Sequence, residues 1–262
     1  MPPTTSPLPI QRFSADLVDT AFSPHRHDTY TFALTTRGVQ AFDYRGATRM
    51  SRPGAVVVLH PDELHDGRPG TEGGFGYAGL TVLPEVLARH RPGRGLPFLA
   101  RGVSQDRNLI QAVRRAFGLA ADASELDREN TLIDLAQALD TVCDAPAPVT
   151  PVTEAIIDTA SRMIRDRVEN GISLAELEAA TGQDRWQLCR DFRALRGTSP
   201  ARYLTQRRLD VVRDGLIRRQ PLAELASAAG FADQAHMSRH FKAAHGISPA
   251  RYARTIVQDR AA

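Results

Sequence analysis

Three histidines in the N-terminal half of the chain could bind a ligand directly. His25 and His27 flank Arg26, and His65 follows 38 residues after His27, close to a second histidine, His60. A neutral imidazole can accept a hydrogen bond from a small molecule, and three imidazoles can together hold zinc or iron. A histidine inside a folded protein is more often a hydrogen-bonded structural residue. These residue types leave three alternatives open: a small-molecule pocket, a metal site and a structural role.

A second set of residues has the chemistry needed to bind DNA. Residues 185–195 and 234–244 both have apolar residues at helical spacing, which places these side chains inward: Leu188, Phe192 and Leu195, then Met237, Phe241 and Ala244. The outward faces are polar: Arg185, Trp186, Cys189, Arg190 and Arg193 in the first segment, and Gln234, Ala235, Ser238, Arg239 and Lys242 in the second. Arginine and glutamine can form paired hydrogen bonds to guanine and adenine edges, whereas Arg193 and Lys242 are suited to phosphates. We predict that these ten residues bind DNA.

Both segments belong to a duplicated unit. Residues 174–177 (Leu-Ala-Glu-Leu) recur at 222–225, and residues 199–203 (Ser-Pro-Ala-Arg-Tyr) recur at 248–252. In each copy a short helix is expected to end at a glycine, Gly182 or Gly230, before the second helix begins. A short helix, a glycine turn and an arginine-bearing helix are what reading the major groove requires. A helical bundle with a solvated arginine face is the alternative for one copy, but two copies in register favour DNA binding.

The segment between the two units predicts a rigid spacer. Residues 200–216 read as one continuous helix, about 25 Å long at about 1.5 Å per residue. A rod of that length can hold two recognition helices about one DNA turn apart, roughly 34 Å, on one face of the duplex. We therefore expect a single chain to read two successive major-groove segments without needing a palindromic site.

The N-terminal half predicts a small β-barrel followed by helices. Short strands are predicted between residues 22 and 82. Apolar and polar residues alternate in 29–35 and 40–44, and residues 55–59 form a continuous apolar run. Helical periodicity from residue 106 to 143 predicts a helical hairpin, which could pack on its own barrel or pair with a second subunit. Three prolines within 145–151 predict a linker. The expected fold is α+β in two domains, residues 1–144 and 152–262, joined by residues 145–151.

Composition places the chain among globular proteins. Hydrophobic residues make up 42% and charged residues 24%, and no apolar run approaches the roughly 20 residues that span a bilayer. Residues 1–10 lack the pattern of a signal peptide. The two cysteines, Cys143 and Cys189, are too few for a disulfide framework and fit a reducing cytoplasm. The segment from residue 151 onward contains 18 basic and 13 acidic residues, whereas the segment before it contains 15 basic and 17 acidic residues. This excess of positive charge indicates a polyanionic partner for the C-terminal half.

The second unit also resembles a known family. Residues 230–242 (Gly-Phe-Ala-Asp-Gln-Ala-His-Met-Ser-Arg-His-Phe-Lys) and 246–252 (Gly-Ile-Ser-Pro-Ala-Arg-Tyr) are similar to the signature of AraC/XylS-type transcription regulators. The resemblance covers about residues 155–257, and it implies two units that bind asymmetric promoter sites, usually in an activator. The first unit departs from this pattern: Gln183 stands where the second has Phe231, and Cys189 is an unusual groove residue.

The N-terminal histidines resemble those of the cupin barrel, which often precedes the DNA-binding unit in this family. Metal-binding cupins have a glutamate about four residues after the second histidine, where this chain has Thr31 and Phe32. The missing carboxylate argues against a cupin dioxygenase or isomerase, and neither a phosphate-binding glycine loop nor a nucleophile elbow is found. We therefore predict no catalytic residues, no metal and no cofactor, and we assign His25, His27 and His65 to effector binding in an apolar pocket.

Together these features predict a cytoplasmic, one-component transcription regulator that is not an enzyme. Its expected partners are double-stranded promoter DNA, a small-molecule effector, RNA polymerase and a second copy of the chain held through the helical hairpin, and no membrane is involved. The alternative of a structural nucleoid protein predicts DNA binding without sequence preference at a fixed salt concentration.

Overall fold

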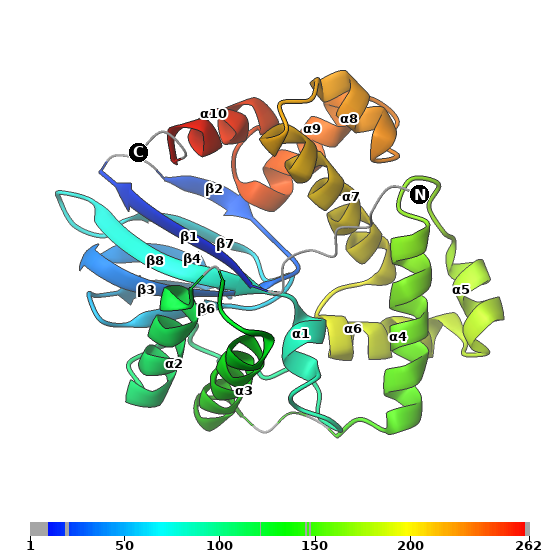
Figure 1. Ribbon diagram of the computed structural model, residues 1–262, viewed down its shortest axis with the longest axis horizontal. Coiled ribbons are helices and arrows are strands. Elements are labelled where there is room, and N and C mark those ends of the chain that lie inside the picture. The colour runs from blue at the N-terminus through cyan, green and yellow to red at the C-terminus, as the bar shows by residue number, and fades with distance from the viewer. Residues whose placement is uncertain (1–9, 19–20, 121, 145, 147, 260–262) are drawn as a thin grey trace. The chain divides into compact units, whose positions relative to one another are not determined.

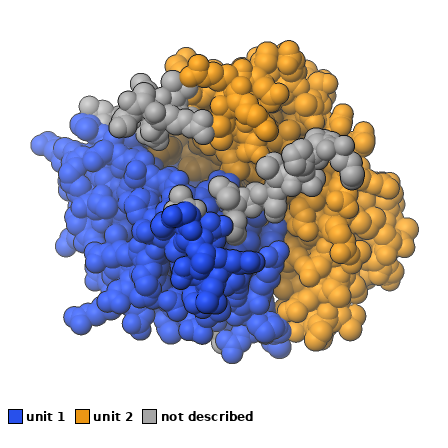
Figure 2. Space-filling model, viewed as in Figure 1, with its two compact units in different colours: residues 1–21, 29–148 blue, residues 22–28, 149–262 orange. Residues whose placement is uncertain are grey.

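The structure is a computed structural model that describes residues 10–18, 21–120, 122–144, 146 and 148–259 (Figure 1). The chain divides into two compact units, shown in different colours in Figure 2: residues 1–21 with 29–148, and residues 22–28 with 149–262. Residues 22–28 thus group with the helical unit, although they lie in the N-terminal part of the sequence. The predicted α+β fold is confirmed.

The N-terminal part of the chain supplies two antiparallel sheets. The strands are β1 (Ile10–Leu17), β2 (Phe22–His25), β3 (Tyr30–Gly38), β4 (Gln40–Tyr44), β5 (Ala47–Ser51), β6 (Val56–Leu59), β7 (His65–Pro69), β8 (Phe75–Val82) and β9 (Val103–Ser104). One sheet has the order β1-β8-β3-β6-β9, and the other has the order β2-β7-β4-β5. The sequence did not indicate β1, because Arg12 and Asp16 interrupt its apolar pattern.

Alternation along β3 and β6 gives the larger sheet two apolar faces. Tyr30 and Phe32 of β3 and Val56 of β6 pack in the cluster that contains the helices, whereas Ala33 and Val57 pack with Phe42, Tyr44 and Leu59 in a second cluster. Successive side chains of a strand point to opposite faces, so a strand buried on both faces must be apolar throughout. All four residues of β6 are buried, as its continuous apolar sequence predicted.

Three helices complete the first unit: α1 (Pro84–Ala88), α2 (Arg107–Gly118) and α3 (Glu125–Val142). Side chains cap the two longer ones, since Asp106 accepts a hydrogen bond from Leu109 N–H and Ser124 accepts one from Asp127 N–H. The predicted hairpin of α2 and α3 is confirmed, and its apolar face packs on the larger sheet of its own chain. Packing on its own barrel is therefore observed, and pairing with a second subunit stays a prediction.

The second unit consists of helices around two small cores. They are α4 (Pro151–Asp166), α5 (Leu174–Thr181), α6 (Arg185–Arg196), α7 (Pro200–Ile217), α8 (Leu222–Ala228), α9 (Gln234–His245) and α10 (Pro249–Asp259). The first core joins α4, α5 and α6, and the second joins α8, α9 and α10. Helix α7 contributes Tyr203 to the first core and Leu209 and Val212 to the second, so the two cores share one continuous rod.

The helix boundaries within this unit differ little from those expected. Helix α7 has 18 residues, about 27 Å at about 1.5 Å per residue, close to the length expected for residues 200–216. Pro151, expected in the linker, opens α4 directly after its cap Thr150, because proline is tolerated in the first helical turn. Residues 145 and 147 of the predicted linker lie outside the described residues. Helix α8 ends at Ala228, two residues before Gly230, whose φ is 75°.

Candidate functional site

The first helix-turn-helix unit is shaped by local hydrogen bonds. Ser173 and Glu176 form a reciprocal capping box at the start of α5, and Gly182 ends that helix in the left-handed conformation with φ of 68°. The carboxylate of Asp184 then accepts hydrogen bonds from the backbone N–H groups of Trp186 (3.0 Å) and Gln187 (3.2 Å). The turn between α5 and α6 is thereby fixed at both ends.

Helix α6 presents the outer face that the sequence predicted. Leu188, Phe192 and Leu195 are buried, and Arg185, Trp186, Arg190 and Arg193 are exposed. The Trp186 side chain is 75% exposed, which is unusual for an indole and leaves its ring available to a partner surface. Cys189 is half-buried with a free thiol, so it contributes only part of its side chain to this face.

Two arginines of α6 already have partners within the unit. The Arg185 guanidinium lies 3.2 Å from the Glu178 carboxylate, which also accepts a hydrogen bond from the Arg185 backbone N–H at 2.9 Å. Arg190 donates to the side-chain oxygen of Gln187, a residue of its own helix. A DNA phosphate or base edge would have to replace these exposed contacts.

Helix α9 carries the equivalent face of the second unit. Asp233 caps it by accepting a hydrogen bond from His236 N–H at 2.6 Å. Its inner residues Met237, Phe241 and Ala244 are buried as predicted. On the outer face Ser238 is half-buried, and the other four residues are exposed: Gln234, Ala235, Arg239 and Lys242. Within the described part of the chain, Arg239 and Lys242 have no ion-pair or hydrogen-bond partner, which distinguishes them from Arg185 and Arg190.

A histidine pair on the flank of α9 was not predicted. The Nε2 atoms of His236 and His240 are 3.0 Å apart, and both rings contact Phe231. Nδ1 of His236 is buried without a partner among the described residues, so the proton of this ring belongs on Nε2, which donates to His240. Burial lowers the pKa of His240, and His236 and Arg239 lower it further. The spacing of four residues on a helix is the signal that could have revealed this pair.

The turn after α4 is held against both helix-turn-helix units. The Arg208 side chain on α7 donates to the carbonyl oxygens of Val168 (2.9 Å) and Glu169 (3.2 Å). Gly230, in the turn of the second unit, lies so close to this segment that a Cβ there would be 2.0 Å from the Glu169 carbonyl oxygen. Arg208 and Gly230 therefore help to set how the second unit is oriented relative to the first.

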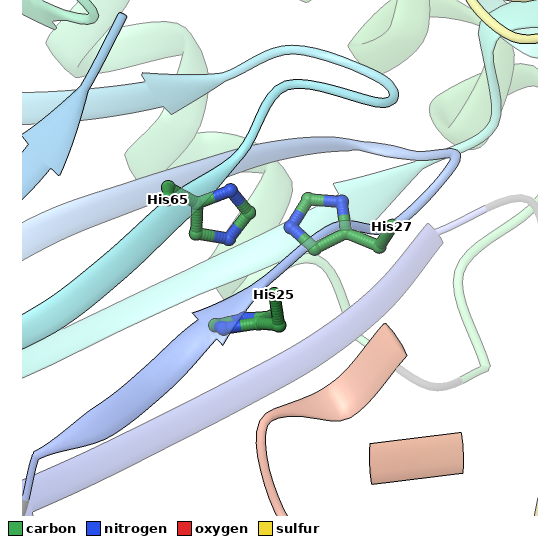
Figure 3. A group of neighbouring side chains, drawn as sticks. All are labelled: His25, His27 and His65. Carbon is green, nitrogen blue, oxygen red and sulfur yellow. The ribbon is translucent and has the colours of Figure 1, made fainter. Parts of the chain in front are cut away.

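The three histidines singled out in the sequence are divided between the two compact units, since His25 and His27 lie in residues 22–28 and His65 lies in the first unit. Figure 3 shows these three side chains. Nδ1 of His25 is 2.8 Å from the Ser23 carbonyl oxygen, and Nδ1 of His65 is 2.9 Å from that of Glu63. A carbonyl oxygen can only accept, so both Nδ1 atoms carry the proton and the Nε2 atom of each neutral ring is unprotonated.

His60, in contrast, is a structural residue of the first unit. It is 2% exposed, its Nδ1 lies 2.6 Å from the Tyr44 hydroxyl, and its Nε2 accepts the Leu99 N–H at 2.9 Å. Burial lowers its pKa to about 3, and the nearby positive charge of Arg45 contributes. Asp62, two residues later, has a turn conformation with φ of 63°.

Comparison with known families agrees with this architecture. Residues 7–139 match the AraC-like ligand binding domain, and residues 177–255 match a helix-turn-helix domain. The chain belongs to the AraC family of transcription regulators.

Relatives of this AraC-family chain share its architecture at low sequence identity. An uncharacterized HTH-type transcriptional regulator of Bacillus subtilis (strain 168), YbfI, is 21% identical over 227 residues, which cover 82% of this chain and 81% of the relative. The 1.65 Å structure of ToxT from Vibrio cholerae is similar with a TM-score of 0.68 at 10% identity, over 94% of this chain and 98% of ToxT. ToxT from strain SCE256 with bound unsaturated fatty acid has a TM-score of 0.67 at 13% identity, over 93% and 94%.

Membership of the AraC family establishes the general role of the two parts. The chain combines a ligand-binding domain with a helix-turn-helix domain, which makes it a small-molecule-sensing, DNA-binding transcription regulator. Members of this family act on transcription and are typically not enzymes. Among the helices that the structure describes, none has both the length and the apolar character needed to cross a membrane.

Proposed function

We propose that this AraC-family regulator binds promoter DNA with α6 and α9 in two adjacent major-groove segments and activates transcription there. One segment would be contacted by the outer face of α6, which consists of Arg185, Trp186, Cys189, Arg190 and Arg193. The other would be contacted by the outer face of α9, which consists of Gln234, Ala235, Ser238, Arg239 and Lys242. The observation that carries the proposal is the duplication itself: two capped helices with buried inner faces and arginine-bearing outer faces, joined by the 18-residue rod α7.

Within this proposal the two units contribute unequally to base recognition. Arg239 needs no rearrangement before it can reach a base edge, because it has no partner among the described residues. Arg190 must first leave Gln187, and Arg185 must leave Glu178. We therefore assign the stronger sequence preference to the second unit. Arg193 and Lys242, in the last turns of their helices, would contact phosphates.

His25, His27 and His65 are the proposed effector-binding residues. Because His25 and His65 present unprotonated Nε2 atoms, they accept hydrogen bonds and do not donate them in the neutral form. A small molecule with hydroxyl or amine donors fits this set, whereas a carboxylate would require a protonated imidazole. ToxT has been solved with an unsaturated fatty acid, so a different effector chemistry is proposed for this chain.

A bound transition-metal ion is the second candidate for the same histidines. Nε2 lone pairs oriented by Nδ1–H bonds to backbone carbonyls are the usual state of metal-ligating histidines, and His25 and His65 both have this arrangement. Thr31 and Phe32, where cupins carry a carboxylate, are both buried and offer no charged ligand. Equilibrium dialysis against Zn²⁺ separates the candidates: the metal site predicts one tightly bound ion that His65→Ala removes, and the small-molecule site predicts none.

Two partners complete the proposal. We propose a homodimer through the hairpin of α2 and α3, whose outer side exposes Leu126, and contact with RNA polymerase at the bound promoter. Sedimentation equilibrium of the wild type and of Leu126→Glu tests the first: a dimer that Leu126→Glu leaves intact would place the interface elsewhere. In vitro transcription from a template that carries the selected binding site tests the second, since an activator raises the transcript yield and a repressor lowers it.

DNA binding is tested by selection and footprinting. A random duplex library is enriched on the purified chain at fixed salt, and the selected duplex is probed with hydroxyl radicals. We expect two protected segments about one helical turn apart, roughly 10 base pairs. Protection of a single segment would contradict the two-groove assignment, and enrichment without any common sequence would indicate a non-specific DNA-binding protein. Arg101→Ala, at an exposed arginine of the first unit outside the hairpin of α2 and α3, is the matched control for later variants.

A further inference from the structure

The second core of the helical unit borders a pocket. Helix α7 contacts both α8 and α10, and the pocket lies where the end of α7, the start of α8 and the first two turns of α10 meet. Its volume of about 610 Å³ is within the range of about 300–1,000 Å³ that is usual for sites of small molecules. The described residues that line it all belong to the second unit: Leu216, Arg219, Gln220, Pro221, Leu222, Ala250, Ala253 and Arg254.

The walls of this pocket are mainly apolar. Leu216 belongs to the second core, and the partly buried Leu222 and Ala253 pack against it. Pro221 and Ala250 add apolar surface that is exposed to solvent. Covering such a wall with an apolar molecule removes both surfaces from water, which is favourable in proportion to the area covered.

The turn that closes one side of the pocket has a defined hydrogen-bond pattern. The N–H of Arg219 donates to the Leu216 carbonyl oxygen, and the N–H of Gln220 donates to that of Gly215, both at 3.0 Å. These two bonds form a Schellman motif at the end of α7, in which Arg219 has the position that requires a left-handed backbone. Its φ is 59°.

An arginine at this position is unusual, because the left-handed conformation favours glycine and strains other L residues. Elsewhere in the same unit the chain follows the usual rule, since α5, α6 and α9 end in this conformation at Gly182, Gly197 and Gly246. Strained residues of this kind are concentrated at functional sites. The fold of the turn does not need the Arg219 side chain, so the reason for an arginine here lies in what its side chain can bind.

The charge of the pocket is positive. Two of its lining residues, Arg219 and Arg254, carry exposed guanidinium groups that have no ion-pair or hydrogen-bond partner in the part of the chain that the structure describes. Among the described lining residues none is acidic. A guanidinium group forms its strongest hydrogen bonds with a carboxylate or a phosphate, so the pocket combines an apolar wall with two groups that bind an anion.

We propose that this pocket is a second ligand site, which binds a small molecule with an apolar body and one anionic head group. The head group, a carboxylate or a phosphate ester, accepts hydrogen bonds from Arg219 and Arg254, and the body covers the apolar wall. A protein partner fits less well, because a stable protein interface buries about 800 Å² on each side, far more surface than these few residues offer. The site goes beyond the function proposed above, since it involves neither the outer faces of α6 and α9 nor the N-terminal histidines.

Isothermal titration calorimetry of the full chain tests the proposal with three probes that share one apolar body: octanoate, octyl phosphate and octanol. We expect saturable binding of at least one of the two anions, at least about tenfold tighter than binding of neutral octanol, because hydrogen bonds between charged groups are the stronger ones. The tighter anion identifies the head group. Equal affinity for octanol, or no saturable binding of either anion, overturns the inference.

The variant Arg219→Gly separates a ligand-binding role from a structural one. Glycine adopts the left-handed conformation without strain, so the midpoint of thermal unfolding should be at or above that of the wild type. Affinity for the anion should nevertheless fall at least about tenfold, because one of the two guanidinium groups is gone. Wild-type affinity in Arg219→Gly, or a lower midpoint that gives Arg219 a structural role, overturns the inference.

Two further variants localise the site. Arg218→Gln is the matched control, since it removes the same charge from the preceding, equally exposed residue, which does not line the pocket, and it should bind as the wild type does. Ala250→Leu places a larger side chain at an exposed lining position and should weaken binding because the apolar body loses room. An equal loss in Arg218→Gln and Arg219→Gly would indicate general charge attraction and overturn the inference. These titrations contain no DNA, so their outcome leaves the proposed function unaffected.

Discussion

The hydroxyl of Tyr44 and Nδ1 of His60 form a buried hydrogen bond of 2.6 Å. On the other side of the ring, Nε2 accepts the Leu99 N–H at 2.9 Å, so Nε2 carries no proton and Nδ1 donates to Tyr44. One neutral imidazole therefore ties strand β4 to the end of β6 and to the segment that contains Leu99. His60 thus stabilises the first unit, whereas His65, five residues later, is one of the proposed effector-binding residues.

Replacing His60 should destabilise the first unit. In His60→Ala the Leu99 N–H and the Tyr44 hydroxyl lose their buried partner and a cavity remains, which together cost about 2–4 kcal/mol. Tyr44→Phe removes only one of the two hydrogen bonds and should cost about 1 kcal/mol. Urea unfolding measures both variants. Equal stability of wild type and His60→Ala would show that these hydrogen bonds do not hold the unit together.

Acid should weaken the fold through the same ring. The pKa of His60 falls to about 3 in the folded protein, whereas in the unfolded chain it is near 6.5, so between these values only the unfolded state binds the proton. The free energy of unfolding should then decrease as pH falls from about 6.5 toward 3, by up to about 1.4 kcal/mol per pH unit. His60→Phe should have a shallower slope over that range. His245, whose pKa burial also lowers to about 3, would supply part of the slope that remains.

The two central arginines should differ in their effect on DNA affinity. Arg239→Ala should weaken binding to the selected duplex by about 1–3 kcal/mol and relax the base preference at one position. Arg190→Ala should act in the same direction but less strongly, because Arg190 gives up its bond to Gln187 on binding. Fluorescence anisotropy titrations at one salt concentration measure both, with Arg101→Ala as control. If neither variant changes affinity, α6 and α9 are not the groove-reading helices.

Lys242 should contribute to affinity without contributing to sequence preference. Its exposed ammonium group in the last turn of α9 has no partner among the described residues. Lys242→Ala should therefore weaken binding to selected and random duplexes equally and reduce the slope of log K against log salt by about 1. Titrations at four salt concentrations on both duplexes give this slope. Weaker binding confined to the selected duplex would instead make Lys242 a base-reading residue.

The two turn glycines should tolerate alanine very differently. Gly182 and Gly230 have similar φ values of 68° and 75°, but a Cβ at Gly182 meets nothing within 4 Å, whereas one at Gly230 meets the Glu169 carbonyl oxygen at 2.0 Å. Gly182→Ala should cost only the backbone strain, about 1 kcal/mol, and Gly230→Ala roughly 2–4 kcal/mol because the Glu169 segment must also move. Thermal and urea unfolding test this, and similar costs at the two positions would contradict the close approach.

Much of the DNA-binding unit could be predicted because its signals are local. The inner faces of α6 and α9, the glycine after α5 and the length of α7 follow from helical periodicity, turn chemistry and the internal repeat. Periodicity and turn chemistry depend on residues within one or two turns of each other, and the repeat is found by comparing two segments of the sequence directly. The short strands β4 and β6 were found for the same reason, whereas β1 was missed because an edge strand with charged residues has no clear alternation.

The sequence by itself determined which segments have apolar residues at helix or strand spacing. From this followed the two-part architecture and the arginine-bearing faces of α6 and α9. Only the tertiary structure decided which charged residues form buried ion pairs and which stay exposed. Arg207 is buried against Asp28, 179 positions away, whereas Arg239 is exposed. It also decided that residues 22–28 group with the helical unit. The physical reason is that such pairings depend on distance in space, and periodicity along the chain carries no information about residues so far apart in sequence.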